Sequence, residues 1–215
     1  MLMESLTSHT DYGAVSLTEA MVDPDPMLEF AAWLAAAEAA GVYEPNAMVV
    51  ATVDPDGRPS SRTVLLKGLD GSGFDFVTNY DSRKGRALRV NPGVTLLFPW
   101  YSMQRQVIVY GTAEATDAAV SDAYFARRPR PARIAALASE QSKPIANREL
   151  LEEQVREVER RYPGDSAIPR PVTWGGFRVV PHAIEFWQGR TSRLHDRLRF
   201  TAQEGGGWTL ERLQP

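Results

Sequence analysis

Residues 47–68 are AMVVATVDPDGRPSSRTVLLKG, and this stretch indicates the class of fold. An apolar run rich in β-branched residues (47–53) is followed by the turn residues DPDGRP (54–59) and by a second apolar run (61–68). Strand-forming runs joined by a short loop of aspartate, proline and glycine are typical of a β-hairpin. The sequence therefore predicts two antiparallel strands in this part of the chain.

Short strands and tight turns recur outside this hairpin, interrupted by helical patterns. Further strands are predicted at 73–79, 94–100, 105–115, 174–181, 183–189, 189–200 and 208–214. Helices are predicted at 27–41, 81–91, 116–128, 131–139 and 147–162. Strands and helices do not alternate as they do in parallel α/β sheets. We therefore expect a mainly β protein, an antiparallel barrel decorated with helices.

The composition is that of a soluble globular protein with 215 residues, 43% of them hydrophobic. We expect a flexible N-terminal segment (1–26) and a single domain (27–215). Cysteine is absent and the three histidines are scattered, which argues against disulfides and against a metal centre. The net charge of −3 disfavours a general nucleic-acid binder.

The first residues, MLMESLTSHT, lack the basic start and apolar run of a signal peptide. The longest apolar stretch (31–42) contains Glu38 and is too short to span a bilayer. We therefore expect a cytoplasmic protein without a membrane segment.

The stretch GRTSRLHDRLRF (189–200) concentrates positive charge. With a period of two, Arg193, His195, Arg197 and Arg199 would share one face of a strand, opposite Leu198 and its neighbours. Like charges at this spacing repel unless water screens them or an anion lies between them. The face is therefore either solvated or a site for a multiply charged anion.

A second basic group occurs in DSRKG (81–85). If Ser82 caps the predicted helix, Arg83 and Lys84 lie in its first turn, where cations oppose the helix dipole. An anion docked at the helix N-terminus would remove this conflict, since free N–H groups and two cations converge there. The alternative is an exposed basic helix start.

Two other pairs combine a cation with a second group. Arg62 and Lys67 would lie on opposite faces of a regular strand, so both can face one ligand only if the strand twists, bulges or ends between them. Tyr124 and Arg128 are four residues apart on a predicted helix and could hold a phosphate together. The alternatives are charges at strand ends that reach water, and a packed tyrosine beside a solvated arginine.

Taken in order, several motifs resemble those of the pyridoxamine 5′-phosphate oxidase family, and they extend over nearly the whole chain from about Pro45. They are RTVLLK (62–67), TNYDSRKG (78–85), PWYSMQRQV (99–107), YFARRPR (124–130), EQSKP (140–144), WGGFRV (174–179), EFWQG (185–189), RLHDRLRF (193–200) and ERLQP (211–215).

This resemblance implies a split β-barrel that forms a homodimer, with flavin mononucleotide (FMN) in clefts at the subunit interface. It assigns the FMN phosphate to Arg83 and Lys84, and the complete cofactor set to Arg62, Thr63, Val64, Leu65, Leu66, Lys67, Val77, Thr78, Arg83, Lys84, Gln106, Gln141, Ser142, Trp187 and Arg197.

The resemblance also implies the substrate and the reaction. Lys67, Tyr124 and Arg128 would bind the substrate phosphate, while the catalytic residues Arg193 and His195 would face its pyridine ring. Tyr12 would contact the substrate from the N-terminal segment. Pyridoxamine or pyridoxine 5′-phosphate would give a hydride from C4′ to FMN. Molecular oxygen would then reoxidise the flavin, forming hydrogen peroxide, with ammonia released from the amine substrate.

Two positions depart from the family pattern. Ala132 stands where the family usually has a serine that bonds the substrate phosphate, and His9 stands where the N-terminal segment often has arginine. One alternative function is a related flavin oxidase of phenazine-type biosynthesis. The other is a protein that binds FMN or pyridoxal 5′-phosphate without catalysis.

Overall fold

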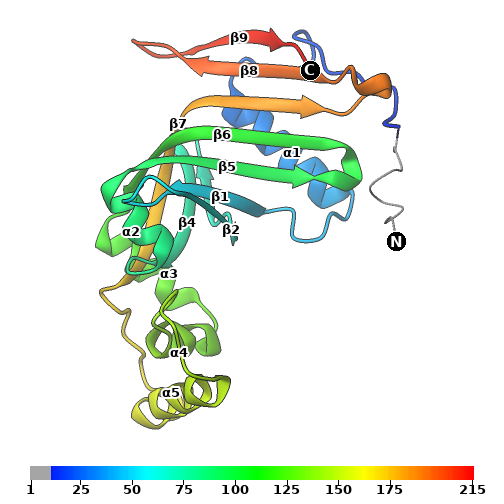
Figure 1. Ribbon diagram of the computed structural model, residues 1–215. Coiled ribbons are helices and arrows are strands. Elements are labelled where there is room, and N and C mark those ends of the chain that lie inside the picture. Colours follow the sequence, from blue (N-terminus) through cyan, green and yellow to red (C-terminus); the bar gives the residue numbers. More distant parts are fainter. Residues whose placement is uncertain (1–10) are drawn as a thin grey trace. The chain divides into compact units, whose positions relative to one another are not determined.

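The structure is a computed structural model that describes residues 11–215, so His9 lies outside the described residues (Figure 1). The helices of this range are α1 (Pro26–Ala39), α2 (Arg83–Val90), α3 (Ala118–Arg127), α4 (Arg130–Ala138), α5 (Arg148–Arg161) and the short 3₁₀ turns η2 (Tyr101–Met103) and η3 (Thr191–Arg193). The strands are β1 (Ala47–Val53), β2 (Pro59–Leu65), β3 (Gly68–Asp70), β4 (Gly73–Asn79), β5 (Gly93–Trp100), β6 (Arg105–Ala115), β7 (Trp174–Gln188), β8 (Asp196–Ala202) and β9 (Trp208–Leu213).

The strands follow the order β2-β1-β5-β6-β7-β4-β3, and β8 pairs with both β7 and β9. The pairs β3–β4, β4–β7, β7–β8 and β8–β9 are antiparallel. In the β4–β7 pair, Thr78 lies opposite Gly175. In the β7–β8 pair, Trp187 lies opposite Arg197. The prediction of an antiparallel sheet with added helices is therefore confirmed.

Contacts within the chain define two compact units. The terminal unit comprises Met1–Val49, of which residues 11–49 are described, together with Leu96–Tyr110 and Pro181–Pro215. The central unit comprises Val50–Thr95 and Gly111–Val180. Each unit has its own buried aromatic residues. The single domain over 27–215 and the flexible segment over 1–26 stay predictions.

The terminal unit packs α1 against aromatic residues of the sheet. Asp25 caps the helix by accepting a hydrogen bond from the Met27 N–H (2.9 Å). Phe30 is fully buried, and its ring lies 4.7 Å from that of Phe98. Burial of such large rings supplies much of the packing energy of a core. The buried face of this alanine-rich helix therefore covers a layer of aromatic side chains.

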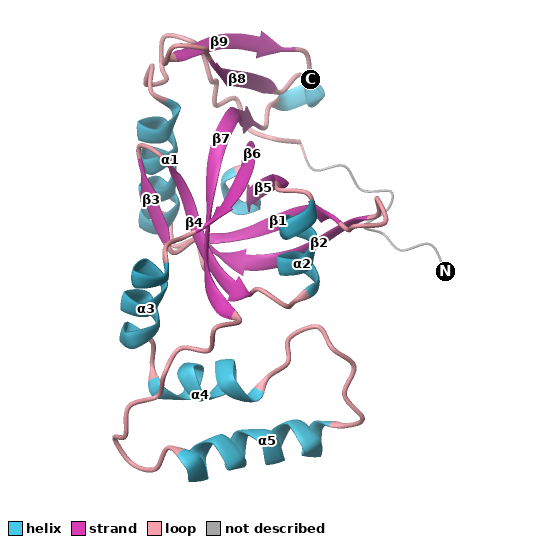
Figure 2. Cartoon of the chain, turned by 90° about the vertical axis from the view of Figure 1, so that its left-hand side faces the viewer, coloured by secondary structure: helices cyan, strands magenta, loops and turns pink. Residues whose placement is uncertain are grey.

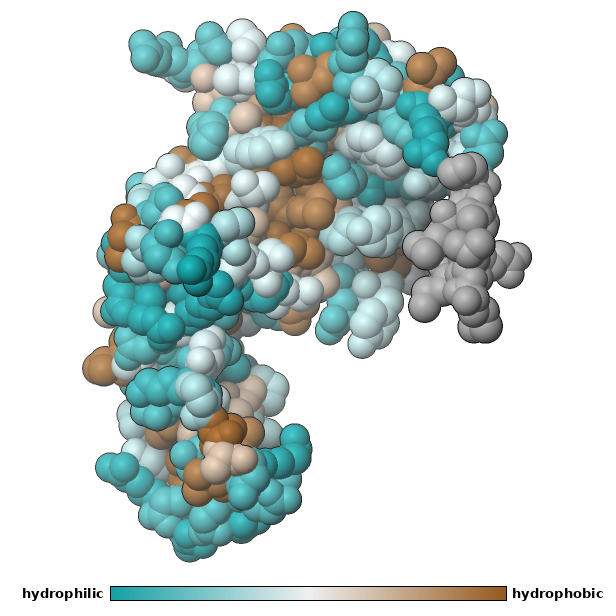
Figure 3. All heavy atoms as spheres, viewed as in Figure 1, coloured by the Kyte–Doolittle hydropathy of each residue, from teal (hydrophilic) through white to brown (hydrophobic). Residues whose placement is uncertain are grey.

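The central unit has a second core, around Phe125 and Trp174, whose rings lie 5.1 Å apart. Val155 and Val158 of α5 pack against this cluster, which places α5 beside α4 (Figure 2). The opposite face of α5 is charged, and mostly hydrophilic side chains cover this part of the chain in Figure 3. The amphipathic pattern of 147–162 thus leads to one buried face and one solvated face.

The prediction for 189–200 was wrong in its first half. Ser192 and Arg193 have positive φ angles (56° and 62°), which bend the chain into η3. Strand β8 begins only at Asp196, and Leu194 is exposed. Alternation holds from that point, since Leu198 and Phe200 are buried. Arg193 and His195 therefore precede the strand that carries Arg197.

Two other boundaries differ from the prediction. The ranges 174–181 and 183–189 form one strand, β7, that continues through Pro181 because the φ angle of proline is compatible with extended backbone. Strand β2 ends at Leu65, between Arg62 and Lys67. The end of this strand meets one of the conditions under which both cations can serve one ligand.

Two features are absent from residues 11–215. None of the helices in this range is both long and apolar enough to cross a membrane. The same range contains no group of histidine and acidic side chains suited to hold a metal ion.

Candidate functional site

Lys84 is a buried cation at the start of α2. Ser82 caps this helix by accepting a hydrogen bond from the Gly85 N–H (3.2 Å), as the sequence predicts. Lys84 is only 7% exposed. Its Nζ donates to Thr78 Oγ1 and to Gln141 Oε1, both at 3.0 Å. Three predicted cofactor residues thus meet at one ammonium group.

The partners of Lys84 are neutral, so its charge is not balanced by them. Burial, and then the positive charge of Arg62, lower the pKa of Lys84 to about 8. A bound anion would reverse both effects, because it replaces the lost hydration and offsets the repulsion between the cations. The environment of Lys84 therefore suits a negatively charged group.

Arg62 and Arg83 are held by different kinds of partner. Arg62 donates to the Val50 carbonyl (3.1 Å), to Thr52 Oγ1 (2.9 Å) and to Ser60 Oγ (2.7 Å). Burial and the charge of Arg83 lower the pKa of Arg62.

Arg83 instead contacts Asp54, from the turn between β1 and β2. Its Nε and Nη2 both donate to Asp54 Oδ2, at 2.8 and 2.6 Å. The Arg83 side chain is 54% exposed, so this pair is screened by water and weaker than its geometry implies. Arg83 could therefore exchange Asp54 for an anion that binds it more strongly.

A hollow of about 510 Å³ brings together the predicted ligands of the substrate phosphate. Leu65, at the end of β2, Val77 and the α3–α4 connection form its walls. The lining residues are Leu65, Lys67, Val77, Tyr124, Arg127, Arg128, Pro129 and Ala132. Lys67, Tyr124 and Arg128 therefore lie around one space, with Ala132 at its wall.

Arg128 brings a buried hydrogen-bond donor without a partner to this hollow. Its guanidinium carbon lies 4.6 Å from the centre of the Trp174 ring. Its Nη1 is buried and has no hydrogen-bond partner in the structure. Burial lowers the pKa of Arg128. A buried N–H group without a partner is costly, so an acceptor in the hollow would stabilise it.

A neighbouring hollow of about 300 Å³ shares Val77, Arg128 and Ala132 with the first. It is also lined by Thr78 and Gln141, the two partners of Lys84. The predicted phosphate ligands of the substrate and part of the predicted cofactor set therefore line adjoining spaces in the central unit.

The terminal unit holds a cluster of rings. The Trp187 and His195 rings lie 4.7 Å apart, and the Tyr12 ring meets Trp187 edge-on at 5.8 Å and His195 at 5.4 Å. Gly189 allows this contact, because a Cβ there would lie 3.0 Å from Tyr12 Cγ and 3.1 Å from Trp187 Cη2. Tyr12, Trp187 and His195 are all predicted site residues, and the structure brings them together.

The Arg190 backbone orients the imidazole of His195. The Arg190 N–H donates to His195 Nδ1 at 3.0 Å. In the neutral ring the proton therefore lies on Nε2, which can donate a hydrogen bond. Neutral His195 would thus offer a donor to a ligand.

Arg197 is paired within the terminal unit. It donates from Nε to Glu185 Oε1 (2.8 Å) and from Nη2 to Glu185 Oε2 (3.1 Å). Its Nη1 donates to the Gln214 carbonyl at 3.0 Å. Arg197 lies opposite Trp187 on the neighbouring strand, so the two side chains share a face of the sheet.

The remaining predicted residues are distributed over both units. In the terminal unit, Gln106 lies on β6 and Arg193 at the end of η3. In the central unit, Leu66 is buried after the end of β2, and Ser142 has a positive φ angle of 72°. Thr63 and Val64 lie within β2.

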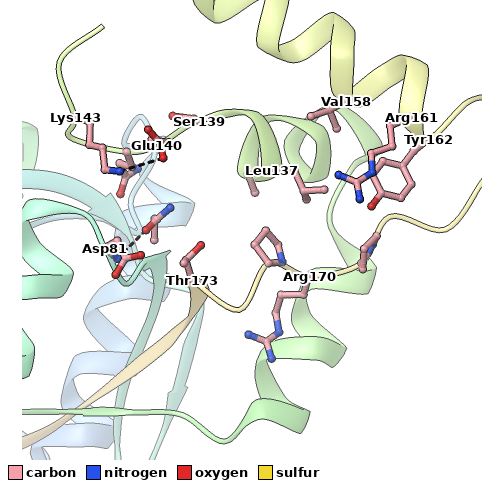
Figure 4. Close-up of a pocket in the computed structure, with 15 residues that line it drawn as sticks. Asp81, Leu137, Ser139, Glu140, Lys143, Val158, Arg161, Tyr162, Arg170 and Thr173 are labelled. Carbon is pink, nitrogen blue, oxygen red and sulfur yellow. Dashed lines mark hydrogen bonds and ion pairs between the residues drawn. The ribbon is translucent and has the colours of Figure 1, made fainter.

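A third cavity, of about 390 Å³, lies in the central unit around α4, α5 and the segment before β7 (Figure 4). Asp81, Glu140, Lys143 and Arg161 are among its charged lining residues. Glu140 and Lys143 form an ion pair at 3.0 Å. Gln141 lines both this cavity and the 300 Å³ hollow.

Several neighbours of the site were missed at the sequence level. Trp174 supports Arg128, Asp54 holds Arg83, and Arg190 contacts His195. Trp174 occurs in a motif that resembles the family, WGGFRV, and this signal could have identified it. The sequence places Asp54 in a turn. Its contact with Arg83 joins residues 29 positions apart, so no local pattern predicts it.

Comparison with known proteins gives the same class of fold. A crystal structure of PhzG from Burkholderia lata 383, in complex with tetrahydrophenazine-1-carboxylic acid, matches with a TM-score of 0.86 and 32% identity, over 95% of this chain and 100% of that chain. A pyridoxamine 5′-phosphate oxidase-related, FMN-binding protein from Nostoc punctiforme matches with a TM-score of 0.70 and 19% identity, over 88% of this chain and 97% of that chain. The fold is therefore that of the FMN-binding split-barrel proteins, as predicted.

The family follows from sequence matches. A model described as "Pyridoxamine 5'-phosphate oxidase" matches residues 34–162, and one described as "Pyridoxine 5'-phosphate oxidase C-terminal dimerisation region" matches residues 174–215. This chain belongs to the pyridoxamine 5′-phosphate oxidase family, a family of oxidoreductases.

Two relatives named pyridoxine/pyridoxamine 5′-phosphate oxidase illustrate the similarity. That of Rubrobacter xylanophilus is 56% identical over 205 residues, 95% of this chain and 94% of the relative. That of Gluconobacter oxydans is 54% identical over 191 residues, 89% of this chain and 94% of the relative.

Proposed function

We propose that this protein is an FMN-dependent oxidase that converts pyridoxamine 5′-phosphate or pyridoxine 5′-phosphate to pyridoxal 5′-phosphate. The observation that carries the proposal is the hollow lined by Lys67, Tyr124 and Arg128, which together with Arg127 places three cations and a phenol around one space. The adjoining hollow reaches Thr78 and Gln141, the partners of Lys84. Two neighbouring anion sites suit two phosphorylated ligands.

The residues of the central unit fit the phosphate of FMN. Lys84 is buried, is bonded to neutral groups and has a pKa lowered to about 8 by burial and by Arg62. Lys84, Arg62 and Arg83 would hold the FMN phosphate, and Thr78 and Gln141 would orient Lys84 toward it. Charge-assisted hydrogen bonds of this kind are among the stronger ones in proteins.

The substrate phosphate would be bound separately. Arg128 would donate its unpartnered Nη1, Lys67 would supply a second positive charge, and Tyr124 would donate its hydroxyl. These contacts fix one end of the substrate, and an oriented substrate reacts faster than one that can rotate. Ala132 provides no hydroxyl in this hollow, so Arg128 and Lys67 carry more of the binding energy.

The ring cluster of the terminal unit would orient the pyridine ring. Nε2–H of neutral His195 would donate to an acceptor on the substrate, and the Arg190 N–H would keep the imidazole in this tautomer. Arg193 would act with His195 on the same ring. Tyr12, packed against Trp187 and His195, would exclude water from that side. Trp187 and Arg197 would contact the cofactor.

FMN, when bound, supplies a ring that accepts a hydride from C4′ of the substrate and passes two electrons to oxygen. For the amine, substrate, O2 and water give the aldehyde, ammonia and hydrogen peroxide. For the alcohol, substrate and O2 give the aldehyde and hydrogen peroxide. We further propose that the protein works as a homodimer, in line with its match to a C-terminal dimerisation region.

A second candidate function is oxidation of a phenazine precursor. It is favoured by the match to PhzG, whose crystal structure contains tetrahydrophenazine-1-carboxylic acid. That ligand carries a carboxylate and no phosphate. The hollow with Lys67, Tyr124 and Arg128 favours the phosphorylated substrate.

A steady-state assay of hydrogen peroxide formation tests the proposal. FMN-loaded protein is given pyridoxamine 5′-phosphate, pyridoxamine without phosphate, or tetrahydrophenazine-1-carboxylic acid. We expect kcat/KM to be about 100-fold or more higher with the phosphate than without it, as for the loss of several charged hydrogen bonds. Faster turnover of the phenazine compound would instead support the second candidate, and no peroxide from any of them would exclude both oxidases.

A further inference from the structure

Leu17 of the N-terminal segment is bound through both of its backbone polar groups. Its N–H donates to Asp196 Oδ2 (3.0 Å), and its carbonyl accepts from Arg212 Nη2 (2.9 Å). Asp196 and Arg212 are joined to each other by a hydrogen bond of 2.7 Å. Two side chains, from β8 and β9, thus replace the neighbouring strand that usually satisfies such backbone groups. We call Asp196, Arg212 and the Leu17 backbone the latch.

Two of the three members of the latch are buried, and all three are strongly bonded. Asp196 is 9% exposed and Leu17 is 5% exposed. Asp196 also accepts a hydrogen bond from Arg190 Nη1 at 3.2 Å. Arg212 makes two further bonds to Glu19, at 2.9 and 3.0 Å. Breaking one member of such a network leaves buried polar groups without partners, which costs more than the loss of an exposed pair.

Upstream of the latch, the same segment contacts the ring cluster. Tyr12 packs on Trp187 and His195, and the Gly13 N–H donates to Gln104 Oε1 at 3.0 Å. Asp11 Oδ1 accepts from the Ser192 N–H at 3.2 Å. In Figure 1 this blue segment runs beside the orange turn η3 and the end of the chain.

The latch and the ring cluster share one loop. Asp196 directly follows His195 in the chain. Arg190 links the two groups, since its N–H donates to His195 Nδ1 and its guanidinium donates to Asp196. A change in the position of Asp196 or Leu17 would therefore be passed to His195 and to Tyr12.

We propose that Asp196 and Arg212 are positioning residues for the substrate, because together they hold residues 11–19 so that Tyr12 packs against Trp187 and His195. This role rests on the proposed oxidase function. Only four residues lie between Tyr12 and Leu17, so fixing Leu17 greatly reduces the conformations open to Tyr12. The latch therefore acts mainly on substrate affinity, because the FMN phosphate is proposed to bind in the central unit.

Substitution of Arg212 tests the latch, with Arg199 as a matched control. Arg199 joins the same two strands through Glu211 at 2.7 Å, and its side chain is 39% exposed against 38% for Arg212. The holoenzyme variants are Arg212→Met, Arg212→Lys and Arg199→Met. Amide hydrogen exchange of residues 11–19 and of β7, kcat, KM, FMN affinity and molecular mass are measured for each.

We expect Arg212→Met to speed exchange in residues 11–19 about tenfold or more while β7 stays protected, because opening becomes local. KM for pyridoxamine 5′-phosphate should rise about tenfold, with kcat changed less than about threefold. This is the pattern expected when a variant loses binding energy that the ground state and the transition state share equally. Arg212→Lys should recover part of both effects, because it keeps one charged donor. Arg199→Met should behave as the unchanged protein. FMN affinity should change less than about threefold in every variant, because the FMN phosphate is proposed to bind in the central unit.

If amide hydrogen exchange in residues 11–19 is unchanged in Arg212→Met, the proposed role of the latch is wrong. It is also wrong if exchange becomes faster while KM stays unchanged. A changed molecular mass with the segment still protected would also contradict it. If Arg212→Met does not fold, Arg212→Lys carries the same test with a smaller expected effect. If the unchanged protein forms no hydrogen peroxide, the proposed function fails, and the exchange result still decides whether the latch holds the segment.

Discussion

Three arginines near the ring cluster of the terminal unit differ in their partners from Lys84 and Arg128 of the central unit. In the terminal unit, Arg197 is paired with Glu185, and Arg190 and Arg212 are both paired with Asp196. In the central unit, Lys84 bonds to a hydroxyl and an amide, and Arg128 stacks on a ring with Nη1 unpartnered.

The carboxylate-paired arginines belong to a structure that is complete without a ligand. Lys84 and Arg128 belong to a site that a bound anion would complete. Carboxylates neutralise Arg190, Arg197 and Arg212 of the terminal unit, so these charges serve to hold loops and rings in place.

Lys84 and Arg128 of the central unit have neutral partners instead, unlike Arg170 and Arg178 of the same unit, which pair with aspartates. Burial of an unbalanced cation is costly, and a phosphate beside Lys84 and Arg128 would relieve that cost. This contrast supports the proposal that Lys84 and Arg128 of the central unit take part in binding anions.

His195→Ala is expected to have the largest effect on turnover. Loss of the imidazole should lower kcat for pyridoxamine 5′-phosphate by about 100-fold or more, the range for a positioned proton donor or acceptor. FMN affinity should stay within about twofold, because binding of its phosphate is assigned to the central unit. His182→Ala, at an exposed position of β7, is the control. Normal turnover by His195→Ala would show that the ring cluster is not the catalytic region.

Lys84→Met, unlike His195→Ala, is expected to weaken the binding of FMN. It removes the buried ammonium group, so FMN should bind about 100-fold more weakly, the upper range for hydrogen bonds to a charged group. Fluorescence titration of the cofactor-free protein with FMN measures the change. Lys143→Met removes an exposed ammonium paired with Glu140 and should leave the affinity unchanged. Equal affinities for the Lys84 and Lys143 variants would remove the basis for a phosphate site at α2.

Arg128→Met should weaken substrate binding in the 510 Å³ hollow without weakening FMN binding. KM for pyridoxamine 5′-phosphate should rise about 30-fold, with FMN affinity nearly unchanged. Pyridoxamine without its phosphate should be turned over equally by the variant and the unchanged protein. An equal loss for both substrates would mean that Arg128 supports the structure of the site and does not bind phosphate.

The lowered pKa of Lys84 predicts a pH dependence. Because the free protein holds this pKa at about 8, FMN affinity should be nearly constant between about pH 7, where the FMN phosphate is a dianion, and pH 8. Above pH 8 it should fall by up to about tenfold per unit. The unfolded chain binds more protons than the folded one between pH 8 and the usual lysine value of 10.5. The Lys84 contribution to the free energy of unfolding of the FMN-free protein should therefore rise with pH in this window. Both effects should vanish in Lys84→Met, and their persistence there would assign them to another group.

Asp54→Asn should have the smallest effect. It removes a negative charge from Arg83, so FMN should bind about threefold more tightly at low salt, in keeping with the modest energy of an exposed ion pair. The gain should disappear in about 1 M salt, where such charges are screened. Weaker binding by this variant would mean that Asp54 orients Arg83 for the phosphate.

Local sequence signals predicted much of the central unit. The hairpin of β1 and β2, the Ser82 cap and the basic start of α2 depend on residues close together in the chain. The sequence leaves open whether a strand ends between Arg62 and Lys67, and the structure places the end of β2 at Leu65. The assignment of individual residues to FMN and substrate came from the family resemblance and stays a prediction.

The terminal unit was less accessible to sequence reasoning. Residues 189–200 have the alternation of a strand, but Ser192 and Arg193 adopt positive φ angles that no glycine marks. The contact between the Arg190 N–H and His195 involves the backbone and leaves no signature in the residue types. The latch joins Leu17 to Arg212, which are nearly the whole chain apart. Such contacts form only after the strands are in register.

An anaerobic titration of the FMN-loaded protein with pyridoxamine 5′-phosphate tests the central claim most directly. We predict that the visible flavin band bleaches as substrate is added, and that it returns when air is admitted, with one hydrogen peroxide formed per flavin. A flavin band that persists while pyridoxamine 5′-phosphate binds would contradict the proposed oxidase function. It would leave a protein that holds FMN and a phosphorylated ligand without reacting them.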